Sequence, residues 1–323
     1  MASAPRGGHG IGVRDDDPFR DEALPRRKHA PQMQTAIQLT LTSLQIGAVY
    51  ILFSLGLTLI FGVMRIVNFA HGHLFAVSAL VVAAIVPWLS ASGFPVLAAY
   101  LIGAVAGILA SLALGFAMYV GGFRFFQRDL VGSFILSIGL VLLLDGILMK
   151  IFGGAVRPMP DIIPGTLSVL GAAITSQRLA LCVAAVAVTA LLYWALTRTK
   201  LGKALRAVSI DHEAAMLQGI PYNRMALSGF MIAAGLAALA GALIAPVTIV
   251  SPVIGADYLI KGFIAVIVGG LGSVPGAILG GLFVAAIETL GGFYFDPSSA
   301  TIAIFILVIA VLLVRPKGLL GHG

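Results

Sequence analysis

Residues 198–224 read RTKLGKALRAVSIDHEAAMLQGIPYNR and form a polar run inside an otherwise apolar chain. The run contains two acidic residues, Asp211 and Glu213, and five basic ones: Arg198, Lys200, Lys203, Arg206 and Arg224. Apolar segments long enough to cross a bilayer lie on both sides of it. Because loops rich in Lys and Arg stay on the cytoplasmic side of a membrane, we expect this loop inside the cell. At about 25 residues it is longer than a simple connection, which indicates a surface that contacts a partner.

The composition of the whole chain indicates a membrane protein. Of its 323 residues, 59% are hydrophobic and 10% are charged, and the mean hydropathy is +1.06. Soluble domains contain about 25% charged residues, so the lipid bilayer is expected to surround most of this chain. The net charge of +7 arises from bases that flank apolar segments or lie near the N-terminus, which is typical of membrane orientation and not of nucleic-acid binding. The single cysteine, Cys182, excludes an intrachain disulfide.

The sequence divides into two regions. Residues 1–35 contain few large apolar residues, mixed charge and several Pro and Gly, so we predict a disordered N-terminal tail. The tail lacks the apolar stretch of a secretory signal peptide. Residues 36–323 form the predicted transmembrane domain, which includes the cytoplasmic loop 198–224.

Eight hydrophobic segments follow one another in this domain. They cover residues 38–62, 66–88, 96–120, 131–152, 178–196, 225–247, 263–290 and 300–314. Since about 20 apolar residues span a bilayer, we predict an all-α fold, a polytopic membrane helical bundle. Two segments are broken: N-F-A-H-G-H at 68–73 interrupts the second, and G-G-L-G-S-V-P-G at 269–276 interrupts the seventh.

Positive charge also predicts the side of each loop. The loop with Arg124 and Arg128 is expected inside, and the linker 153–177 outside. Arg315 and Lys317 favour an inside C-terminus, which requires segment 263–290 to enter and return or to consist of two short pieces. The six Lys and Arg residues before residue 36 favour an inside N-terminus, but only if segment 66–88 also returns to its own side, so the sequence leaves this side open.

The two breaks predict where a solute passes. Non-helical backbone at membrane depth survives only where protein buries it or where it lines a water-filled cavity. Broken segments in corresponding parts of two halves are typical of transporters built from inverted repeats, with the pathway between the repeats. We therefore predict inverted repeats and these pathway candidates: Asn68, His71, His73, Gly269, Gly270, Gly272 and Ser273. The alternative for Asn68, His71 and His73 is hydrogen bonding to the freed backbone groups.

Charged residues inside spans are costly and usually face the bundle interior. Asp145 lies deep in its segment and is expected to pair with Lys150 or with another span, as a structural pair or in a functional role. Glu288 is expected to point into the bundle. Asp257 and Lys261, four residues apart beside the second break, are expected to form a local ion pair.

The third segment carries a stripe of small residues. Every fourth position is Ala, Gly or Ser: Ala99, Gly103, Gly107, Ser111 and Gly115. Such a stripe lets two helices approach closely in a membrane, so we predict a packing face there.

No motif of catalysis is present. The sequence has no G-x-x-x-x-G-K-[ST], no G-x-S-x-G and no H-E-x-x-H, and His71 and His73 lack a third metal ligand nearby. We therefore expect a non-catalytic chain that binds no cofactor or metal and hydrolyses no nucleotide by itself.

Residues 213–219, E-A-A-M-L-Q-G, follow the pattern E-A-A-x-x-x-G. This pattern resembles the cytoplasmic coupling motif of ABC importer permeases, in which a short helix docks in a groove of the ATPase subunit. The resemblance implies that a helix over about 207–220 couples this chain to an ATPase. The residues it assigns to coupling are Glu213, Ala214, Ala215 and Gly219, and we add Asp211, two residues before the motif, to the coupling candidates.

Three longer stretches resemble the branched-chain amino acid permease family, in its type with the shorter hydrophobic core. They are GLTLIFGVMRIVNFAHG at 56–72, GKALRAVSIDHEAAMLQGI at 202–220 and KGFIAVIVGGLGSVPGAILGGLF at 261–283. The resemblance covers residues 36–320, and the long N-terminal tail departs from the usual pattern. It implies a bacterial inner-membrane location and these partners: a second related permease or a copy of itself, two ATP-binding cassette ATPase subunits that use ATP, and an extracytoplasmic solute-binding protein.

The resemblance favours a permease subunit of an ATP-driven importer for branched-chain or related amino acids. The same family also imports urea, short amides and aromatic acids, and its binding protein carries most of the selectivity. A self-sufficient channel or ion-coupled carrier is the alternative from another class, and would need a charge relay such as Asp145 with Glu288. A membrane scaffold without transport is the third possibility.

Overall fold

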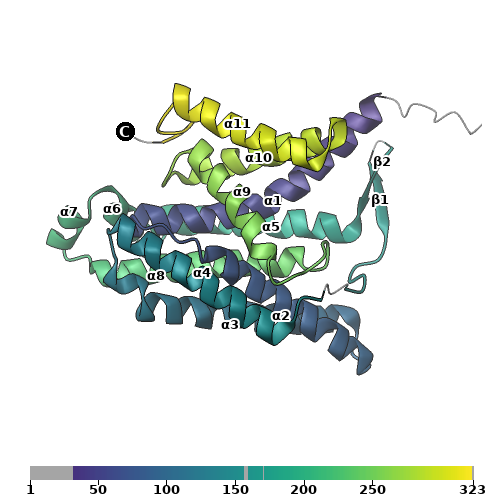
Figure 1. Ribbon diagram of the computed structural model, residues 1–323, viewed down its shortest axis with the longest axis horizontal. Helices are drawn as coiled ribbons and strands as arrows, with labels where there is room; N and C mark the ends of the chain where they lie inside the picture. The colour runs from purple at the N-terminus through teal and green to yellow at the C-terminus, as the bar shows by residue number, and fades with distance from the viewer. Residues whose placement is uncertain (1–31, 156–158, 170, 322–323) are drawn as a thin grey trace, which may run out of the picture.

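The computed structural model describes residues 32–155, 159–169 and 171–321 (Figure 1). Nearly all of the predicted tail, residues 1–35, lies outside this part of the chain. The described residues form eleven α-helices, one 3-10 turn and one antiparallel hairpin: α1(Gln32–Met64), α2(His71–Ala91), α3(Val96–Gly121), η1(Phe123–Phe125), α4(Leu130–Phe152), β1(Thr166–Val169), β2(Ala172–Thr175), α5(Ser176–Arg198), α6(Lys200–Ile210), α7(His212–Leu217), α8(Tyr222–Ile244), α9(Ile254–Gly269), α10(Val274–Tyr294) and α11(Pro297–Val314).

Eight of these helices are long and apolar enough to cross a membrane: α1, α2, α3, α4, α5, α8, α10 and α11. The prediction of an all-α polytopic bundle with eight hydrophobic segments is therefore confirmed. Helices α6 and α7 are too short to span. Helix α9 has 16 residues, so it is about 24 Å long against a hydrocarbon core of about 30 Å.

The two ends of the bundle differ in charge. Helices α6 and α7 lie at the left end in Figure 1, and the β-hairpin lies at the right. Gly62 of α1 lies against Ser209 of α6, and the amide of Arg128 donates to the carbonyl of Met64 at 3.1 Å. The basic loops before α4 and after α5 therefore share one end, which we assign to the cytoplasm because of its positive charge.

Helix α1 begins at the opposite, outer end. Gln38 accepts a hydrogen bond from the amide of Ala173 at 3.0 Å, and the side chain of Gln34 donates to the carbonyl of Gly171 in the hairpin turn. The start of α1 thus lies beside the hairpin, and the helix runs inward from there. The sequence left this side open, and the contacts with the hairpin decide it.

The broken seventh segment consists of two antiparallel helices, α9 and α10, joined at residues 270–273. Their backbones touch: a Cβ atom on Gly269 would lie 2.0 Å from the carbonyl oxygen of Gly276, and one on Gly280 would lie 2.0 Å from that of Ala265. Only glycine permits such an approach. The prediction that this segment consists of two pieces is confirmed, but the second piece is not short, because the 21 residues of α10 are enough to span the membrane.

The C-terminus returns to the same inner end. The amides of Leu319 and Leu320 donate to the carbonyls of Val268 and Gly269, at 2.8 and 2.9 Å. The segment after α11 therefore lies beside the turn 270–273, and Gly272 in that turn faces Gly62 near the cytoplasmic end of α1. The basic Arg315 and Lys317 are inside, as their charge predicts.

The first break lies between two helices and not within one. Helix α1 extends to Met64, residues 65–70 are non-helical, and α2 begins at His71, within the quoted motif. The predicted interruption of one segment at 68–73 is therefore wrong. The physical reason is Arg65, whose φ of +50° is left-handed and ends the preceding helix.

Helices α1, α2, α8, α9 and α10 contribute most of the buried centre, and the small-residue stripe of α3 packs onto α2 and α8. All five stripe residues are buried. A Cβ atom on Gly107 would lie 2.7 Å from the carbonyl oxygen of Ser78, and Ser111 donates to the carbonyl of Leu74 at 2.8 Å. The predicted packing face is confirmed, whereas the inverted repeats stay a prediction.

Candidate functional site: an outer cavity above an inner constriction

A cavity of about 360 Å³ lies in the outer half of the buried centre. Helices α1, α8, α9 and α10 and the loop 245–253 line it. The side chain of Gln177, at the outer start of α5, donates to the carbonyl of Pro246 in that loop, which places the cavity near the outer end. Its volume lies within the range of small-molecule sites, about 300–1,000 Å³.

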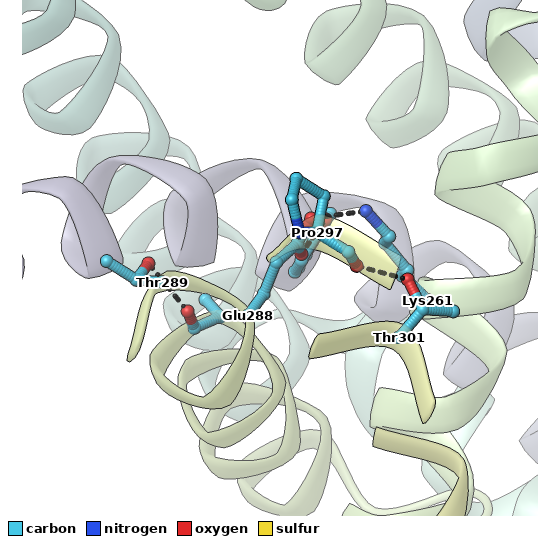
Figure 2. Close-up of polar contacts among 7 residues, drawn as sticks. Lys261, Glu288, Thr289, Pro297 and Thr301 are labelled. Atoms are coloured by element: carbon cyan, nitrogen blue, oxygen red, sulfur yellow. Dashed lines mark hydrogen bonds and ion pairs between the residues drawn. The ribbon is translucent and has the colours of Figure 1, made fainter. Parts of the chain in front are cut away.

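One ion pair joins the two sides of this cavity. Nζ of Lys261 in α9 contacts Oε1 of Glu288 in α10 (Figure 2), and the hydroxyl of Tyr50 in α1 donates to Oε2 of the same carboxylate. The two charged side chains are 25% and 24% exposed. Glu288 therefore points into the bundle, as expected from the sequence.

The expected local ion pair between Asp257 and Lys261 is wrong. Because glycines bring α9 and α10 into backbone contact, Lys261 faces α10 and meets Glu288 there. Asp257 lines the same cavity, is exposed, and has no ion-pair partner among the described residues.

Aromatic rings close the inner side of the cavity. Tyr50 and Tyr258 line it, with ring centroids 5.8 Å apart, and Tyr258 packs against Phe75 at 4.5 Å. Phe75 in turn contacts Phe53 at 5.8 Å, and both phenylalanines are fully buried. We call Tyr50, Phe53, Phe75 and Tyr258 the aromatic seal, because their ring contacts form a continuous chain from the cavity to His71, beside the first break.

The two non-helical segments meet inward of the aromatic seal. Ile66 and Asn68 of the first and Leu271 of the second line one void of about 10 Å³, room for about one water molecule. Asn68 is 1% exposed, and neither atom of its amide has a hydrogen-bond partner in the described residues. The non-helical segments 65–70 and 270–273 thus meet at this small void, which we call the inner constriction.

The other candidates in the second break shape its turn. Gly270 and Gly272 have φ values of +111° and +82°, which side chains rarely adopt, and Gly269 contacts backbone. Ser273 caps α10 by accepting from the amide of Gly276 at 3.2 Å. These residues position the turn, and their part in a pathway stays a prediction.

The two histidines have different surroundings. His73 in α2 bonds to Asp145 in α4 at 2.8 Å, so Asp145 pairs with another span and not with Lys150. His71 is fully buried against the ring of Phe53, and its ring nitrogens make no well-formed hydrogen bond in the described residues, although the backbone of Phe53 lies within looser hydrogen-bonding reach. Among the described residues, the side chains of Asn68 and His73 therefore make no hydrogen bond to freed backbone, and the backbone contact of His71 is to Phe53 inside α1.

The cytoplasmic loop contains two helices, α6 and α7, and the single helix expected over 207–220 is wrong. Asp211 separates them because it has extended backbone and its carboxylate accepts from the amides of Glu213 and Ala214, at 3.0 and 3.1 Å. Gly219 ends α7 with a φ of +83°, and the amide of Ile220 donates to the carbonyl of Ala215 at 3.1 Å. This is a Schellman-type end, for which glycine is preferred.

The two helices present apolar side chains to the cytoplasm. Ile210 is 81% exposed and Leu217 87% exposed, whereas Leu205 and Val208 of α6 are buried against the bundle. Glu213 and Ala214 of α7 are exposed, and Ala215 is buried. Exposed apolar groups rimmed by polar ones are typical of a protein-binding surface.

Sequence reasoning did not identify the pair of Lys261 with Glu288 or the aromatic seal. A usable signal existed, because Lys261 lies eight residues before Gly269 and Glu288 eight residues after Gly280. Eight residues is about 2.2 helical turns, so each charge lies within about 80° of a contact glycine around the helix and on the same side of it. Among the described residues, no group of three or more His, Cys, Asp and Glu side chains is placed to hold a metal ion.

Comparisons with known proteins give one family. The model of the family "Branched-chain amino acid transport system / permease component" matches residues 39–314. The chain is 30% identical to the high-affinity branched-chain amino acid transport system permease protein BraD of Pseudomonas aeruginosa, over 90% of this chain and 98% of the relative. It is 30% identical to LivH of Escherichia coli K12, over 88% and 96%, and to a probable LivH of Methanocaldococcus jannaschii, over 84% and 88%. No solved structure gave a significant match.

Proposed function

Because this chain belongs to the family of permease components of branched-chain amino acid transport systems, we propose that it forms the solute pathway of an ATP-driven importer for branched-chain or related amino acids. The chain is a multi-pass inner-membrane protein. The observation that carries the proposal is that α7 exposes the apolar side chains of Met216 and Leu217 at the basic end. The sequence contains no nucleotide-binding motif, so a separate chain must supply ATP hydrolysis.

In this proposal an ATPase subunit docks on α6 and α7. Movement of the docked subunit reaches the bundle through Leu205 and Val208, since α6 packs on α1 and α8. Helix α1 then transmits this movement to the outer cavity, because its residues Phe53 and Tyr50 belong to the aromatic seal and Tyr50 also lines the cavity. Asp211 and Gly219 hold α7 in shape, and Glu213, Ala214 and Ala215 form its body.

The solute follows a path from the outer cavity to the inner constriction. An extracytoplasmic binding protein delivers it to the outer end, the aromatic seal opens, and the solute passes Asn68, His71 and the turn 269–273. His73 stays paired with Asp145 and holds α4 against α2.

The proposed assembly contains two permease chains, two ATPase chains and the extracytoplasmic binding protein. A second related permease, or a copy of this one, completes the membrane part, and two ATPase chains consume ATP on its cytoplasmic side, so this chain needs no cofactor of its own. Urea, short amides or aromatic acids are the alternative solutes within the same family.

Co-purification tests the proposal most simply. A tagged chain is extracted from membranes and tested for bound ATPase subunits, beside the variant Leu217→Asp, which places a charge on the exposed face of α7. The tagged wild-type chain is expected to retain ATPase subunits and the variant to lose them, with equal membrane insertion. Solute uptake that continues without ATPase subunits would contradict the proposal and favour a channel or ion-coupled carrier.

A further inference from the structure

We infer that the outer cavity is a recognition site for a zwitterionic amino acid, whose carboxylate binds Lys261 and whose ammonium group binds Glu288 and Asp257. The inference rests on the proposed function, because it names the chemical class of the imported solute. It also assigns to this chain a share of selectivity beyond that of the binding protein.

The charges of the cavity match those of the solute. The cavity offers one cation, Lys261, and two carboxylates, Asp257 and Glu288. An amino acid carries one carboxylate and one ammonium group, so it replaces the contact between Lys261 and Glu288 by two contacts of the same kind. Asp257, which has no ion-pair partner in the described residues, supplies a second acceptor for the ammonium group.

The remaining wall suits an aliphatic side chain. Besides the polar groups, the lining consists of branched apolar residues: Ile46, Val49, Ile244, Val247, Ile249 and Ile254. Small-molecule sites combine such a wall with a few placed polar groups that fix orientation. A branched-chain amino acid would place its charged end between α9 and α10 and its side chain against α1 and α8.

The ion pair also argues against the other solute classes. An aromatic acid carries only a negative charge, so it would bind Lys261 and leave both carboxylates facing a like charge. Urea and amides are neutral and cannot replace the attraction between Lys261 and Glu288. Separating a partly buried ion pair without replacing its charges is unfavourable, so a zwitterion can bind between Lys261 and Glu288 at a lower cost than these solutes.

Tyr50 connects the site to the aromatic seal. Its hydroxyl donates to Glu288, and its ring contacts Tyr258 and lies 5.9 Å from Nζ of Lys261. When the solute's ammonium group takes the place of Lys261 at Glu288, the partners of Tyr50 change too. The same residue therefore senses the solute and forms part of the barrier that must open.

The test uses the complete transporter, with its binding protein, in membrane vesicles. Uptake of leucine is measured for the wild type, for Lys261→Met and for Glu288→Gln. Each variant is expected to lower leucine uptake by roughly 30-fold, the lower end of the effect of removing one partner of a hydrogen-bonded charge pair, because this pair is only partly buried. Lys150→Met, which removes the same charge from α4 outside the cavity, is the matched control and is expected to transport normally.

The double variant Lys261→Glu/Glu288→Lys separates recognition from folding. It keeps an ion pair, so the thermal stability of the complex is expected to return to the wild-type value. Leucine uptake is expected to stay low. The exchange moves the cation from α9 to α10 and places two carboxylates, at positions 257 and 261, on α9, so the charged groups of the solute no longer meet their partners. Full recovery of uptake in the double variant would show a structural pair only and would overturn the inference.

Other outcomes distinguish the two proposals. ATP-driven uptake of leucine at the wild-type rate by both single variants overturns the inference and leaves the importer intact. ATP-driven uptake of acetamide but not of leucine by the wild type also overturns the inference and leaves the importer intact. Absence of any ATP-driven uptake overturns the proposed function itself.

Discussion

The outer and inner halves of the buried centre differ in both polarity and volume. The outer half contains a cavity of about 360 Å³ with Lys261 paired to Glu288, whereas the inner half contains a void of about 10 Å³ at Asn68. The aromatic seal lies between them. The chain is thus open on the outer side and closed on the inner side, and the helices that meet the cytoplasm, α6 and α7, attach at the closed half.

The largest expected effect comes from the glycine contact that holds α9 on α10. Gly269→Ala would place a Cβ atom 2.0 Å from the carbonyl oxygen of Gly276, whereas Gly139 in α4 has no atom within 4 Å of such a position. We expect Gly269→Ala to lower the stability by about 3 kcal/mol, the upper part of the usual range for overpacking, and to disrupt both the cavity and the constriction. Thermal unfolding of the purified chain measures this, with Gly139→Ala as the control.

Gly219 tests whether the ATPase docks on α7, at the closed half. Gly219→Arg strains a left-handed position at the end of α7 and is expected to lower uptake by roughly 5- to 150-fold, the range of typical coupling energies, while ATP hydrolysis and membrane insertion continue. Gly93→Arg imposes similar strain at a φ of +90° in the outer loop after α2. Its ratio of uptake to hydrolysis should match the wild type, and normal uptake in Gly219→Arg would count against docking at α7.

Asn68 tests the constriction itself. Asn68→Leu removes an unpartnered buried amide, so we expect the stability to rise by about 1 kcal/mol while uptake falls. Thr58→Val removes another unpartnered buried group, on α1, and should raise stability without the loss of uptake. Equal uptake in the two variants would show that the solute does not pass Asn68.

The smallest expected effect compares two aspartates that cap helices at opposite ends. Asp211 caps α7 inside, and Asp296 caps α11 outside by accepting from the amides of Ser298 and Ser299 at 2.8 and 3.0 Å. Asp211→Ala should weaken the stimulation of ATP hydrolysis by the loaded binding protein, and Asp296→Ala should not. A similar loss of this stimulation in both variants would show that the effect of Asp211→Ala does not depend on its place at the cytoplasmic end.

The pH dependence of the outer cap follows from its hydrogen bonds. The hydroxyl and amide of Ser299, followed by Ser298, hold the pKa of Asp296 below its ordinary value. A lowered pKa means that the cap stabilises the fold above the pKa of the unfolded chain, about 3.9, and that this contribution is lost as the pH falls through the lowered value. Acid unfolding of Asp296→Ala should therefore begin at a higher pH than that of the wild type.

Much of the fold was predictable from the sequence because apolar length and glycine spacing are local signals. The segments, the break at 269–276 and the packing stripe of α3 all follow from them. The helix end at Met64 was not predictable, since it depends on the left-handed backbone of Arg65.

The candidate site was predictable only at its inner half. Asn68 and the glycine turn are visible as irregular sequence, but the partner of a charged residue depends on which helix faces it. Spacing in the sequence pairs Lys261 with Asp257, and only the backbone contact of α9 with α10 assigns it to Glu288. The pair of Asp145 with His73 is a second example of a partner set by packing.

The central claim is that α7 faces the cytoplasm, where a separate ATPase docks on it. In a Cys182→Ala background, Leu217→Cys and Phe295→Cys offer two exposed positions at opposite ends, since these side chains are 87% and 79% exposed. A membrane-impermeant thiol reagent on intact cells should label Phe295→Cys at once and Leu217→Cys only after permeabilisation. Labelling of Leu217→Cys in intact cells would contradict the account.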